Sequence, residues 1–408
     1  MCCFAGPEFE LAKFCEKGKI IKCVKALYGL SSSAARWRNH LADTFRGLGY
    51  ERTVADPDAW IRADSVGYSY IGSHIDDLFI VGETSVVKSI CARLKQVYVM
   101  KTLDSLPVSH LGIGYERVNW DGIERLELHC DTYCTEMLRK LTHDAREWMP
   151  RNNSETVLGG ARLPIRPSLE PEMFASSSDA KIHTLLNVRD HRLYQQIVGA
   201  VNWAVLVGRL DVAFALSSLS RFSSAPRRAH MTAAIRMLQY LNKNRGWRIR
   251  IEPNEFKPLG HIRECQFKTN DWRKNYPDAS ESPYLDECLP DPRWSELQVS
   301  AFSDSDLAHD KVTRRSVTGM VLMAGSTPII YSAKRQGCIS APTYSAELMA
   351  VREATVKVIE LHLLMRSLGV AVQSASKLYC DNLGVFQSVG EGESATKRHT
   401  SIAYHLVP

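Results

Sequence analysis

The chain has 408 residues, of which 45% are hydrophobic and 24% charged, a length and composition that fit two or three folded domains and argue against a largely disordered protein. No unbroken apolar run is long enough to cross a bilayer, and the eleven cysteines are scattered without C-x-x-C pairs, so we expect an intracellular protein of the cytoplasm or nucleus with neither a membrane partner nor a disulfide framework. The net charge of +6 permits an anionic partner but is too small to identify one.

The first element expected is an amphipathic helix that begins at Ser32 or Ser33 and stops at Gly49. Its apolar residues recur every three or four positions, at Trp37, Leu41, Phe45 and Leu48. A second helix is expected from the same spacing of Val87, Ile90, Leu94 and Val97.

Between these helices, residues 68–71 and 78–81 are rich in β-branched and aromatic side chains and predict two strands. Asp76 and Asp77 lie between the strands, so a hairpin would present two adjacent carboxylates near its turn. Taken alone, the pair fits ordinary turn chemistry better than a metal site, because aspartate side chains hydrogen-bond nearby backbone in turns.

The middle of the chain alternates between turn-rich and helical stretches. Residues 146–188 are rich in proline, glycine, asparagine and serine and predict a linker, whereas residues 192–241 carry apolar stripes at helical spacing and predict a small helical module. Residues 252–296 contain six prolines and many charges, which predict an irregular insertion.

The C-terminal block predicts three strands at 297–303, 317–323 and 329–332, then a helix over 343–368 stopped by Gly369, then a strand over 377–380. Asp304 ends the first strand, Glu347 lies in the first turns of the helix and Asp381 ends the last strand. Three carboxylates at these places suit Mg²⁺ or Mn²⁺, which two-metal phosphodiester cleavage uses to bracket the attacking and leaving oxygens. Each residue also has a structural interpretation, as a strand-end, helix-dipole or turn carboxylate.

This block resembles the RNase H domain of copia-type retrotransposon Pol polyproteins. The matching strings are Ser303-Asp304-Ser305-Asp306, Tyr344-Ser345-Ala346-Glu347-Leu348 and Cys380-Asp381-Asn382, with flanking matches at 314–319, 332–336, 397–399 and 404–405. The resemblance implies a metal-dependent nuclease that cuts the RNA strand of RNA–DNA hybrids, with Asp304, Glu347 and Asp381 as catalytic metal ligands. Many family members have a fourth carboxylate where this chain has Ser401, and Asp306 and His405 are candidates to assist the metals in its place.

The N-terminal half resembles the palm and thumb of a copia-type reverse transcriptase. The strings are 25–30, Arg36-Trp37, Ala55-Asp56-Pro57-Asp58 and His74-Ile75-Asp76-Asp77, followed by His110-Leu111-Gly112 and by connection-like strings between Tyr194 and Leu241. The resemblance implies that Asp76 and Asp77 hold catalytic metals. The family's fingers and another palm aspartate lie upstream of Met1, so we expect an N-terminally truncated palm, no polymerase activity from this chain alone, and the missing part of Pol as a potential partner.

Two further groups of residues have a functional and a structural interpretation. Arg314, Arg315, Lys334 and Arg335 flank the triad and are candidates to contact nucleic-acid phosphates, although an ordinary basic surface has the same composition. Cys130 and Cys134 beside His129 suggest a metal site, but helical packing is the better interpretation because no partnering pair lies nearby.

The sequence therefore predicts a multidomain protein of α+β and α/β class. Its expected parts are a partial reverse transcriptase palm and thumb (1–145), a linker (146–190), a helical connection (191–250), an irregular insertion (251–296) and an RNase H-like βββαβ domain (297–408). The expected function is that of a Pol fragment, at most a metal-dependent ribonuclease on RNA–DNA hybrids. The alternative is a transposon remnant that binds nucleic acid without cutting it or has no activity.

Overall fold

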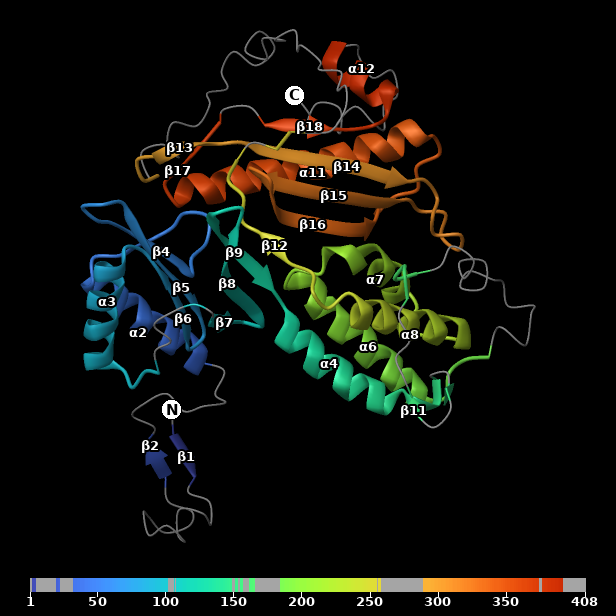
Figure 1. Cartoon of the computed structure of the whole chain (residues 1–408), viewed down its shortest axis with the longest axis horizontal. Helices are drawn as coiled ribbons and strands as arrows, with labels where there is room; N and C mark the ends of the chain where they lie inside the picture. The colour runs from blue at the N-terminus through green and yellow to red at the C-terminus, as the bar shows by residue number, and fades with distance from the viewer. Residues whose placement is uncertain are drawn as a thin grey trace. The chain divides into compact units, whose positions relative to one another are not determined.

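The computed structural model forms two compact units, Met1–Thr102 and Leu103–Pro408 (Figure 1). It describes residues 32–101, 106, 108–148, 161–165, 184–254, 256–257, 289–373 and 376–391, and the backbone of the short strands at 2–4, 20–22, 151–152 and 155–156. Over these ranges, no helix is both long enough and apolar enough to span a bilayer.

The first unit is a four-stranded antiparallel sheet with two helices. The strands follow one another in the order β3 (Glu51–Arg52), β4 (Ala59–Ala63), β5 (Tyr68–His74) and β6 (Asp77–Val81), and the helices are α2 (Ser33–Gly47) and α3 (Thr84–Val97). A separate strand pair joins β1 (Cys2–Phe4) to β2 (Ile20–Lys22). Both predicted helices and the predicted hairpin are confirmed.

The core of this unit lies between the helices and one face of the sheet. Trp60 and Ile71, which are paired across β4 and β5, pack with Phe45 of α2 and with Ile90 and Leu94 of α3. Ile71, Phe45 and Leu94 are completely buried. The helical spacing recognised in the sequence is therefore the spacing of the buried stripe.

The second unit begins with a small sheet in the order β12-β9-β8-β7 and a group of helices. The strands are β7 (Val108–His110), β8 (Ile113–Trp120), β9 (Ile123–His129) and β12 (Ile249–Arg250), and the short pair β10 (Arg151–Asn152) and β11 (Glu155–Thr156) lies apart from them. The helices, which we call the helical module, are α4 (Asp131–Asp144), α6 (Val188–Leu206), α7 (Ala213–Ser220) and α8 (Arg228–Lys243), with 3-10 turns η1 (Arg146–Trp148) and η3 (Leu210–Val212).

Helix α4 shares its core with helices that lie beyond the predicted linker. Leu138 and Leu141 of α4 belong to the same buried cluster as Ile197 of α6 and Leu238 of α8. The chain consequently divides into its compact units between Thr102 and Leu103, whereas the sequence predicted a domain boundary within 146–190. The difference arises because the shared apolar core, and not the turn-rich segment, decides what folds together.

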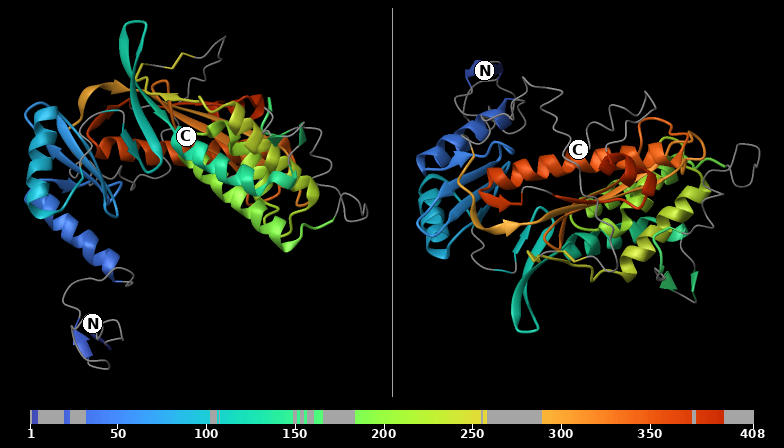
Figure 2. Two further views of the ribbon diagram at one scale, coloured as in Figure 1. Left: turned by 60° about the horizontal axis from the view of Figure 1, so that its bottom comes forward. Right: turned by 90° about the horizontal axis from the view of Figure 1, so that it is seen from above.

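The C-terminal module is a four-stranded sheet in the order β16-β15-β14-β18, with one long helix and flanking short elements (Figure 2). Its elements are β13 (Arg293–Leu297), β14 (Val299–Asp306), β15 (Val317–Ala324), β16 (Thr327–Arg335), α11 (Thr343–Ser367), β17 (Val370–Val372), β18 (Lys377–Tyr379) and α12 (Leu383–Glu391). Strands β14 to β16 form an antiparallel meander and β18 pairs parallel to β14. The predicted order of three strands, a helix and a strand is confirmed, with β17 as an addition.

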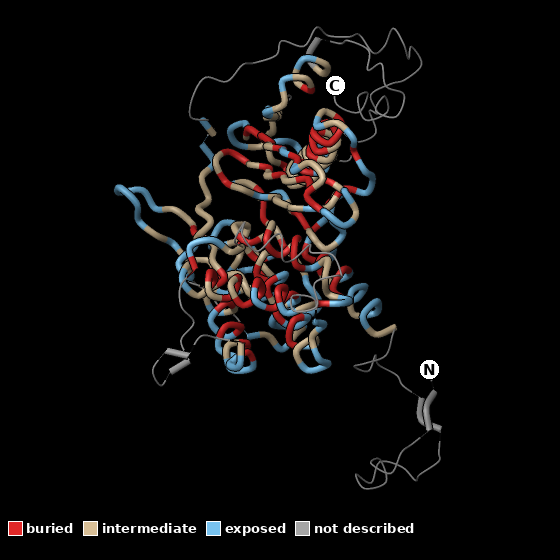
Figure 3. Tube along the Cα trace, turned by 90° about the vertical axis from the view of Figure 1, so that its right-hand side faces the viewer, coloured by how far each residue is buried: buried red, intermediate tan, exposed pale blue. Residues whose placement is uncertain are grey.

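Helix α11 covers one face of this sheet. Val299 and Ala301 of β14 and Leu322 of β15 point to that face and pack with Ala354 and Leu361 of α11. Figure 3 shows buried positions running through the sheet, α11 and the helical module. The alternate residues of β14 point to the opposite face, which the helical module approaches.

The described residues at the two ends of the predicted irregular insertion make specific backbone contacts. Residue 251 extends from β12, and the backbone N–H of Ser326, in the β15–β16 turn, donates to the Glu252 carbonyl at 2.9 Å. Gly325 in the same turn has φ +59°, and a Cβ there would lie 2.5 Å from the Pro253 oxygen, so only glycine fits. At the other end, β13 pairs in parallel with β17, a pairing that the proline-rich composition did not predict.

Candidate metal centre

Asp304 lies near the end of β14, and Asp381 lies just beyond the end of the adjacent parallel strand β18. Phe302 of β14 pairs with Tyr379 of β18, and each aspartate follows two residues later. The two rings stack, with centroids 4.6 Å apart and an angle of 10° between their planes. Both aspartates and both rings line the same cavity, and both aspartates are exposed to solvent.

Glu347 supplies a third carboxylate from the first turns of α11. It is only 4% exposed, and its Oε2 atom has no hydrogen-bond partner. Burial, followed by the charges of Asp304 and Asp381, raises the pKa of Glu347 to about 7, against a backbone hydrogen bond from Ser305. A buried carboxylate facing two others is unfavourable unless a proton or a cation compensates it.

Cys380 is a neighbour that sequence reasoning did not single out, although it directly precedes Asp381. One potential metal-ligand atom each from Glu347, Cys380 and Asp381 lies within 4.8 Å of the other two. Asp304 is not part of this group, but its charge contributes to the raised pKa of Glu347. Burial raises the pKa of the Cys380 thiol, and the Asn382 backbone N–H donates to its sulfur at 3.4 Å. Because Mg²⁺ and Mn²⁺ prefer oxygen ligands, the carboxylates are better candidates than this thiol to bind such a cation.

The residues fit a hard divalent cation. The buried and unpartnered Glu347 oxygen points to a missing positive charge, and the two exposed aspartates leave room for water and substrate oxygens. Mg²⁺ and Mn²⁺ take oxygen ligands from one or two carboxylates with several remaining positions open, whereas structural zinc sites prefer a closed set of sulfur and nitrogen ligands.

Gln336 fixes the start of α11 against the sheet. Its backbone N–H donates to the Ser316 carbonyl at 2.8 Å, and its buried side-chain Nε2 donates to the Ala346 carbonyl at 2.9 Å and to Thr318 Oγ1 at 3.1 Å. Ala346 directly precedes Glu347, so this amide positions the buried carboxylate. The sequence contained Gln336 within a family string but gave no sign of this role.

A cavity of about 550 Å³ opens beside the aspartates. Its walls are the sheet face opposite α11, including Phe302, Tyr331 and Tyr379, and the η3–α7 segment, including Leu210 and Phe214. Tyr331 further ties the two walls, because its hydroxyl donates to the Val205 carbonyl of α6 at 2.5 Å. The helical module thus forms one side of the approach to Asp304 and Asp381.

The four basic residues predicted to contact nucleic acid are in different situations. Arg314 and Lys334 are exposed and Arg315 is half-buried. Arg335 is engaged in an ion pair, with Nη1 2.7 Å from Asp310 Oδ2. Arg314, Arg315 and Lys334 are therefore better placed than Arg335 to meet a phosphate.

The two auxiliary candidates also differ. Asp306 is exposed and forms an ion pair with His309, with His309 Nδ1 2.8 Å from Asp306 Oδ2. His405 and Ser401 lie outside the described residues.

In the first unit, Asp76 and Asp77 lie at the turn of the β5–β6 hairpin. His74 pairs with Asp77, Ile75 has φ +56°, and both aspartates are exposed. Trp37 Nε1 of α2 donates to the Ile75 carbonyl at 2.6 Å, which anchors the turn to the helix. Within the described ranges, no third histidine, cysteine, aspartate or glutamate joins this pair into a compact metal group.

Cys130 and Cys134 pack as the sequence predicted. Both are buried, at 3% and 1% exposure, in a cluster with Ala204 and Val207. Their sulfur atoms lie 3.4 Å apart. Among the described residues, they are not part of a compact metal group.

Comparison with known proteins finds a family match in the first part of the chain. Residues 7–146 match the family described as reverse transcriptase (RNA-dependent DNA polymerase). No solved structure matches the chain.

Individual relatives extend this match beyond the first half. The Retrovirus-related Pol polyprotein from transposon RE1 of Arabidopsis thaliana is 23% identical over 95% of this chain, and that from transposon TNT 1-94 of Nicotiana tabacum is 23% identical over 98%. The chain covers 22% and 26% of those polyproteins. The transposon Ty5-1 protein of Saccharomyces cerevisiae is 21% identical over 81% of this chain and 87% of its own length. The chain is thus similar over most of its length to Pol polyproteins of copia/Ty-type retrotransposons, and its residues 7–146 match the reverse transcriptase family.

Proposed function

We propose that the C-terminal module is an RNase H-like nuclease that hydrolyses the RNA strand of RNA–DNA hybrids, with Asp304, Glu347 and Asp381 as its metal ligands. The observation that carries the proposal is the buried, unpartnered Glu347 oxygen beside two exposed aspartates on adjacent strand ends. Strands β14 to β16, α11 and β18 supply the βββαβ order expected for such a domain.

Each carboxylate has a distinct part in this proposal. Bound Mg²⁺ or Mn²⁺ would stabilise the charge that develops on the attacking and leaving oxygens of the phosphodiester. Glu347 accepts a backbone hydrogen bond from Ser305 and follows Ala346, whose carbonyl is bonded by the Gln336 amide, so it would bind the cation from the buried side. Asp304 and Asp381 are exposed, so they can face both the cation and the phosphate.

Basic residues near the site support a nucleic-acid substrate. Arg314, Arg315 and Lys334 supply positive charge that neutralises backbone phosphates without reading base sequence. Recognition of an RNA–DNA hybrid then rests on duplex shape and on the 2′-hydroxyls.

For the first unit we propose a reverse transcriptase palm in which Asp76 and Asp77 are metal ligands. The described residues offer them no third ligand, and two adjacent carboxylates on an exposed hairpin hold a cation weakly. We therefore propose that nucleotide addition needs a further carboxylate ligand beside Asp76 and Asp77.

The test of the nuclease is cleavage of an RNA–DNA hybrid that carries a label on the RNA strand. The purified chain should shorten the RNA in Mg²⁺ or Mn²⁺, and Asp304→Asn should abolish the cut while most of the hybrid binding remains. A chain that binds the hybrid, leaves it intact in both metals and is unaffected by Asp304→Asn would instead be the non-catalytic remnant, an alternative favoured by Ser401 at the place of a fourth carboxylate.

A further inference from the structure

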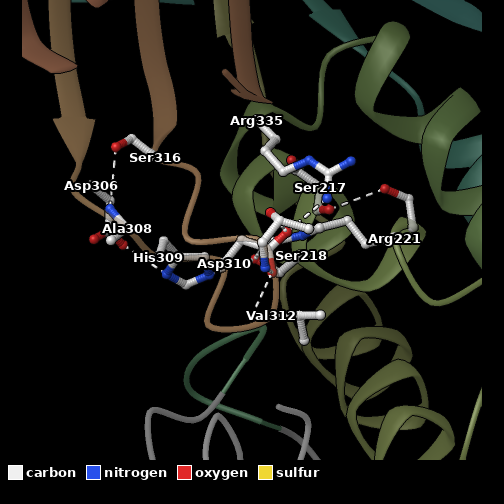
Figure 4. A network of polar contacts seen from close by, with 12 residues as sticks. Ser217, Ser218, Arg221, Asp306, Ala308, His309, Asp310, Val312, Ser316 and Arg335 are labelled. Atoms are coloured by element: carbon white, nitrogen blue, oxygen red, sulfur yellow. Dashed lines mark hydrogen bonds and ion pairs between the residues drawn. The ribbon is translucent and has the colours of Figure 1, made fainter. Parts of the chain in front are cut away.

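A network of polar contacts joins the helical module to the loop that follows β14 (Figure 4). The loop, residues 307–316, connects Asp306 at the end of β14 to Val317 at the start of β15. It therefore begins three residues after Asp304.

Asp310 is the centre of the loop and is only 3% exposed. Its Oδ1 accepts the backbone N–H groups of Val312 and Thr313 at 3.1 and 3.2 Å, and its Oδ2 accepts the Thr313 hydroxyl at 2.6 Å. Arg335 of β16 adds the charged hydrogen bond at 2.7 Å. The Asp310 carboxylate thereby determines the shape of the loop.

The backbone of Asp310 holds the two arginines that the loop presents. The Arg314 N–H donates to the Asp310 carbonyl at 2.6 Å, and the Asp310 N–H donates to the Arg315 carbonyl at 3.1 Å. Arg314 has φ +57°, a conformation that an arginine adopts only when its surroundings impose it. The backbone at the exposed Arg314 is thus held by contacts to Asp310.

The helical module reaches the same carboxylate. Arg221, which follows α7, has Nη1 3.6 Å from Asp310 Oδ2, and its Nη2 donates to Ser218 Oγ at 3.3 Å. Ser218 Oγ in turn lies 3.4 Å from His309 Nε2, and the ring of Phe214 packs edge-on against His309 at 5.0 Å. Figure 4 shows these side chains of α7 and of the loop turned toward one another.

We infer that Asp310 and Arg221 are positioning residues, which hold loop 307–316 so that Arg314 and Arg315 meet nucleic-acid phosphates beside Asp304. The inference rests on the proposed nuclease function and makes the helical module part of the substrate-binding site. Neither residue touches substrate; both act through the loop.

The lowered pKa of Asp310 agrees with a carboxylate that stays ionised. Burial by itself raises the pKa of Asp310, but hydrogen bonds from Thr313 and Arg335 and the nearby Arg221 hold it well below its usual range. Loss of either Arg221 or Arg335 leaves the buried Asp310 carboxylate with less positive charge beside it. The loop is therefore expected to rearrange rather than to remain in place.

The test compares Arg221→Gln with Arg245→Gln in the full chain. Arg245 belongs to the same helical module but is exposed and bonds to Asn242. Binding of a labelled RNA–DNA hybrid is measured in EDTA between about 50 and 200 mM salt, and cleavage kinetics are measured in Mg²⁺.

Arg221→Gln should reduce the slope of log affinity against log salt by about one to two, the loss of one or two phosphate contacts at about 0.9 each. Its KM for cleavage should rise about tenfold with a smaller fall in kcat, because substrate positioning and not chemistry is impaired. Arg245→Gln should match the unmodified chain in both, and Arg221→Lys, which keeps the charge, should recover part of the slope.

An Arg221→Gln variant with the salt slope and KM of Arg245→Gln would overturn the inference. If Arg221→Gln does not fold, Arg221→Lys is compared with Arg245→Gln instead. A purely structural role of Arg221 would lower the folded fraction but leave the salt slope and KM of the folded protein unchanged. A chain that does not cut hybrid but shows the reduced slope in Arg221→Gln would refute the nuclease and keep the positioning role. Failure of the unmodified chain to bind hybrid would overturn both.

Discussion

Asp304 on β14 and Asp381, just beyond the end of the parallel strand β18, each lie two residues after the stacked pair Phe302 and Tyr379. This register places one carboxylate from each strand at the same end of the sheet, where α11 brings Glu347. The strand pairing, and not any sequence proximity, assembles the site: 77 positions separate the two aspartates (381 minus 304).

The buried carboxylate predicts an unusual dependence of stability on pH. The folded-state pKa of Glu347 is about 7, above its value in an unfolded chain, so the fold favours the protonated form. Metal-free protein should therefore lose stability as pH rises from about 4 to 7, and Glu347→Gln should remove a penalty of about 1–3 kcal/mol above pH 7. Chemical denaturation in EDTA at several pH values measures the difference.

Glu136→Gln is the matched control for that experiment, because Glu136 is exposed on α4. It should change stability little at any pH. The explanation fails if Glu347→Gln is as stable as the unmodified chain at pH 8, or if its advantage does not shrink toward pH 4.

The Gln336 amide predicts a stability effect that metal does not correct. Gln336→Leu removes the buried hydrogen bonds to the Ala346 carbonyl and to Thr318 Oγ1, so it should destabilise the fold by about 1–3 kcal/mol. Gln195→Leu, at an exposed residue of α6 that donates to the Ser223 carbonyl, should cost less. Equal denaturation midpoints for the two variants would contradict the role given to Gln336.

Substitution of Arg314 should affect nucleic-acid binding, whereas substitution of Arg335 should affect stability. Arg314→Gln should reduce the salt dependence of hybrid binding by about one phosphate contact and leave stability unchanged. Arg335→Gln should instead destabilise the fold by about 1–3 kcal/mol, because it removes a charged hydrogen bond from buried Asp310. Fluorescence anisotropy and thermal unfolding of both variants separate these effects; a stable Arg335→Gln protein would argue against the Asp310 ion pair.

In the first unit, the Trp37 indole predicts local control of the Asp76–Asp77 hairpin. Trp37→Phe keeps an aromatic ring but loses the donor to the Ile75 carbonyl, a hydrogen bond worth about 1 kcal/mol. Amides near Ile75 should then exchange with solvent faster than in the unmodified chain. Trp247→Phe, at an exposed tryptophan, is the control, and identical exchange at the hairpin in both variants would count against the anchor.

The sequence predicted most local elements, because their signals are local. The apolar spacing around Phe45 and Leu94 identified α2 and α3, and the alternating strands and long helix of the C-terminal module followed from the same reasoning. The carboxylates were also predictable, since each lies at the end of a recognisable element. Their mutual placement stayed a hypothesis, because strand register is not visible in sequence.

Relationships between distant segments were not predictable. The buried contact of Arg335 with Asp310, the packing of α4 on α6 and α8, and the pairing of β13 with β17 all depend on tertiary structure. Arg335 illustrates the difficulty: a basic residue beside an acidic motif is a reasonable phosphate contact until its partner is known. Cys380 was missed for a similar reason, since only the fold brings its sulfur to Glu347.

Asp304, Glu347 and Asp381 should form one divalent-cation centre, and calorimetric titration of the full chain with Mn²⁺ tests this most directly. The unmodified chain should bind Mn²⁺ with release of protons near pH 7, as Glu347 loses its proton, and Asp304→Asn and Asp381→Asn should each weaken binding by more than about tenfold. Asp121→Asn, at the exposed tip of the β8–β9 hairpin, should bind as the unmodified chain does. Equal Mn²⁺ affinity in all four proteins would contradict the account.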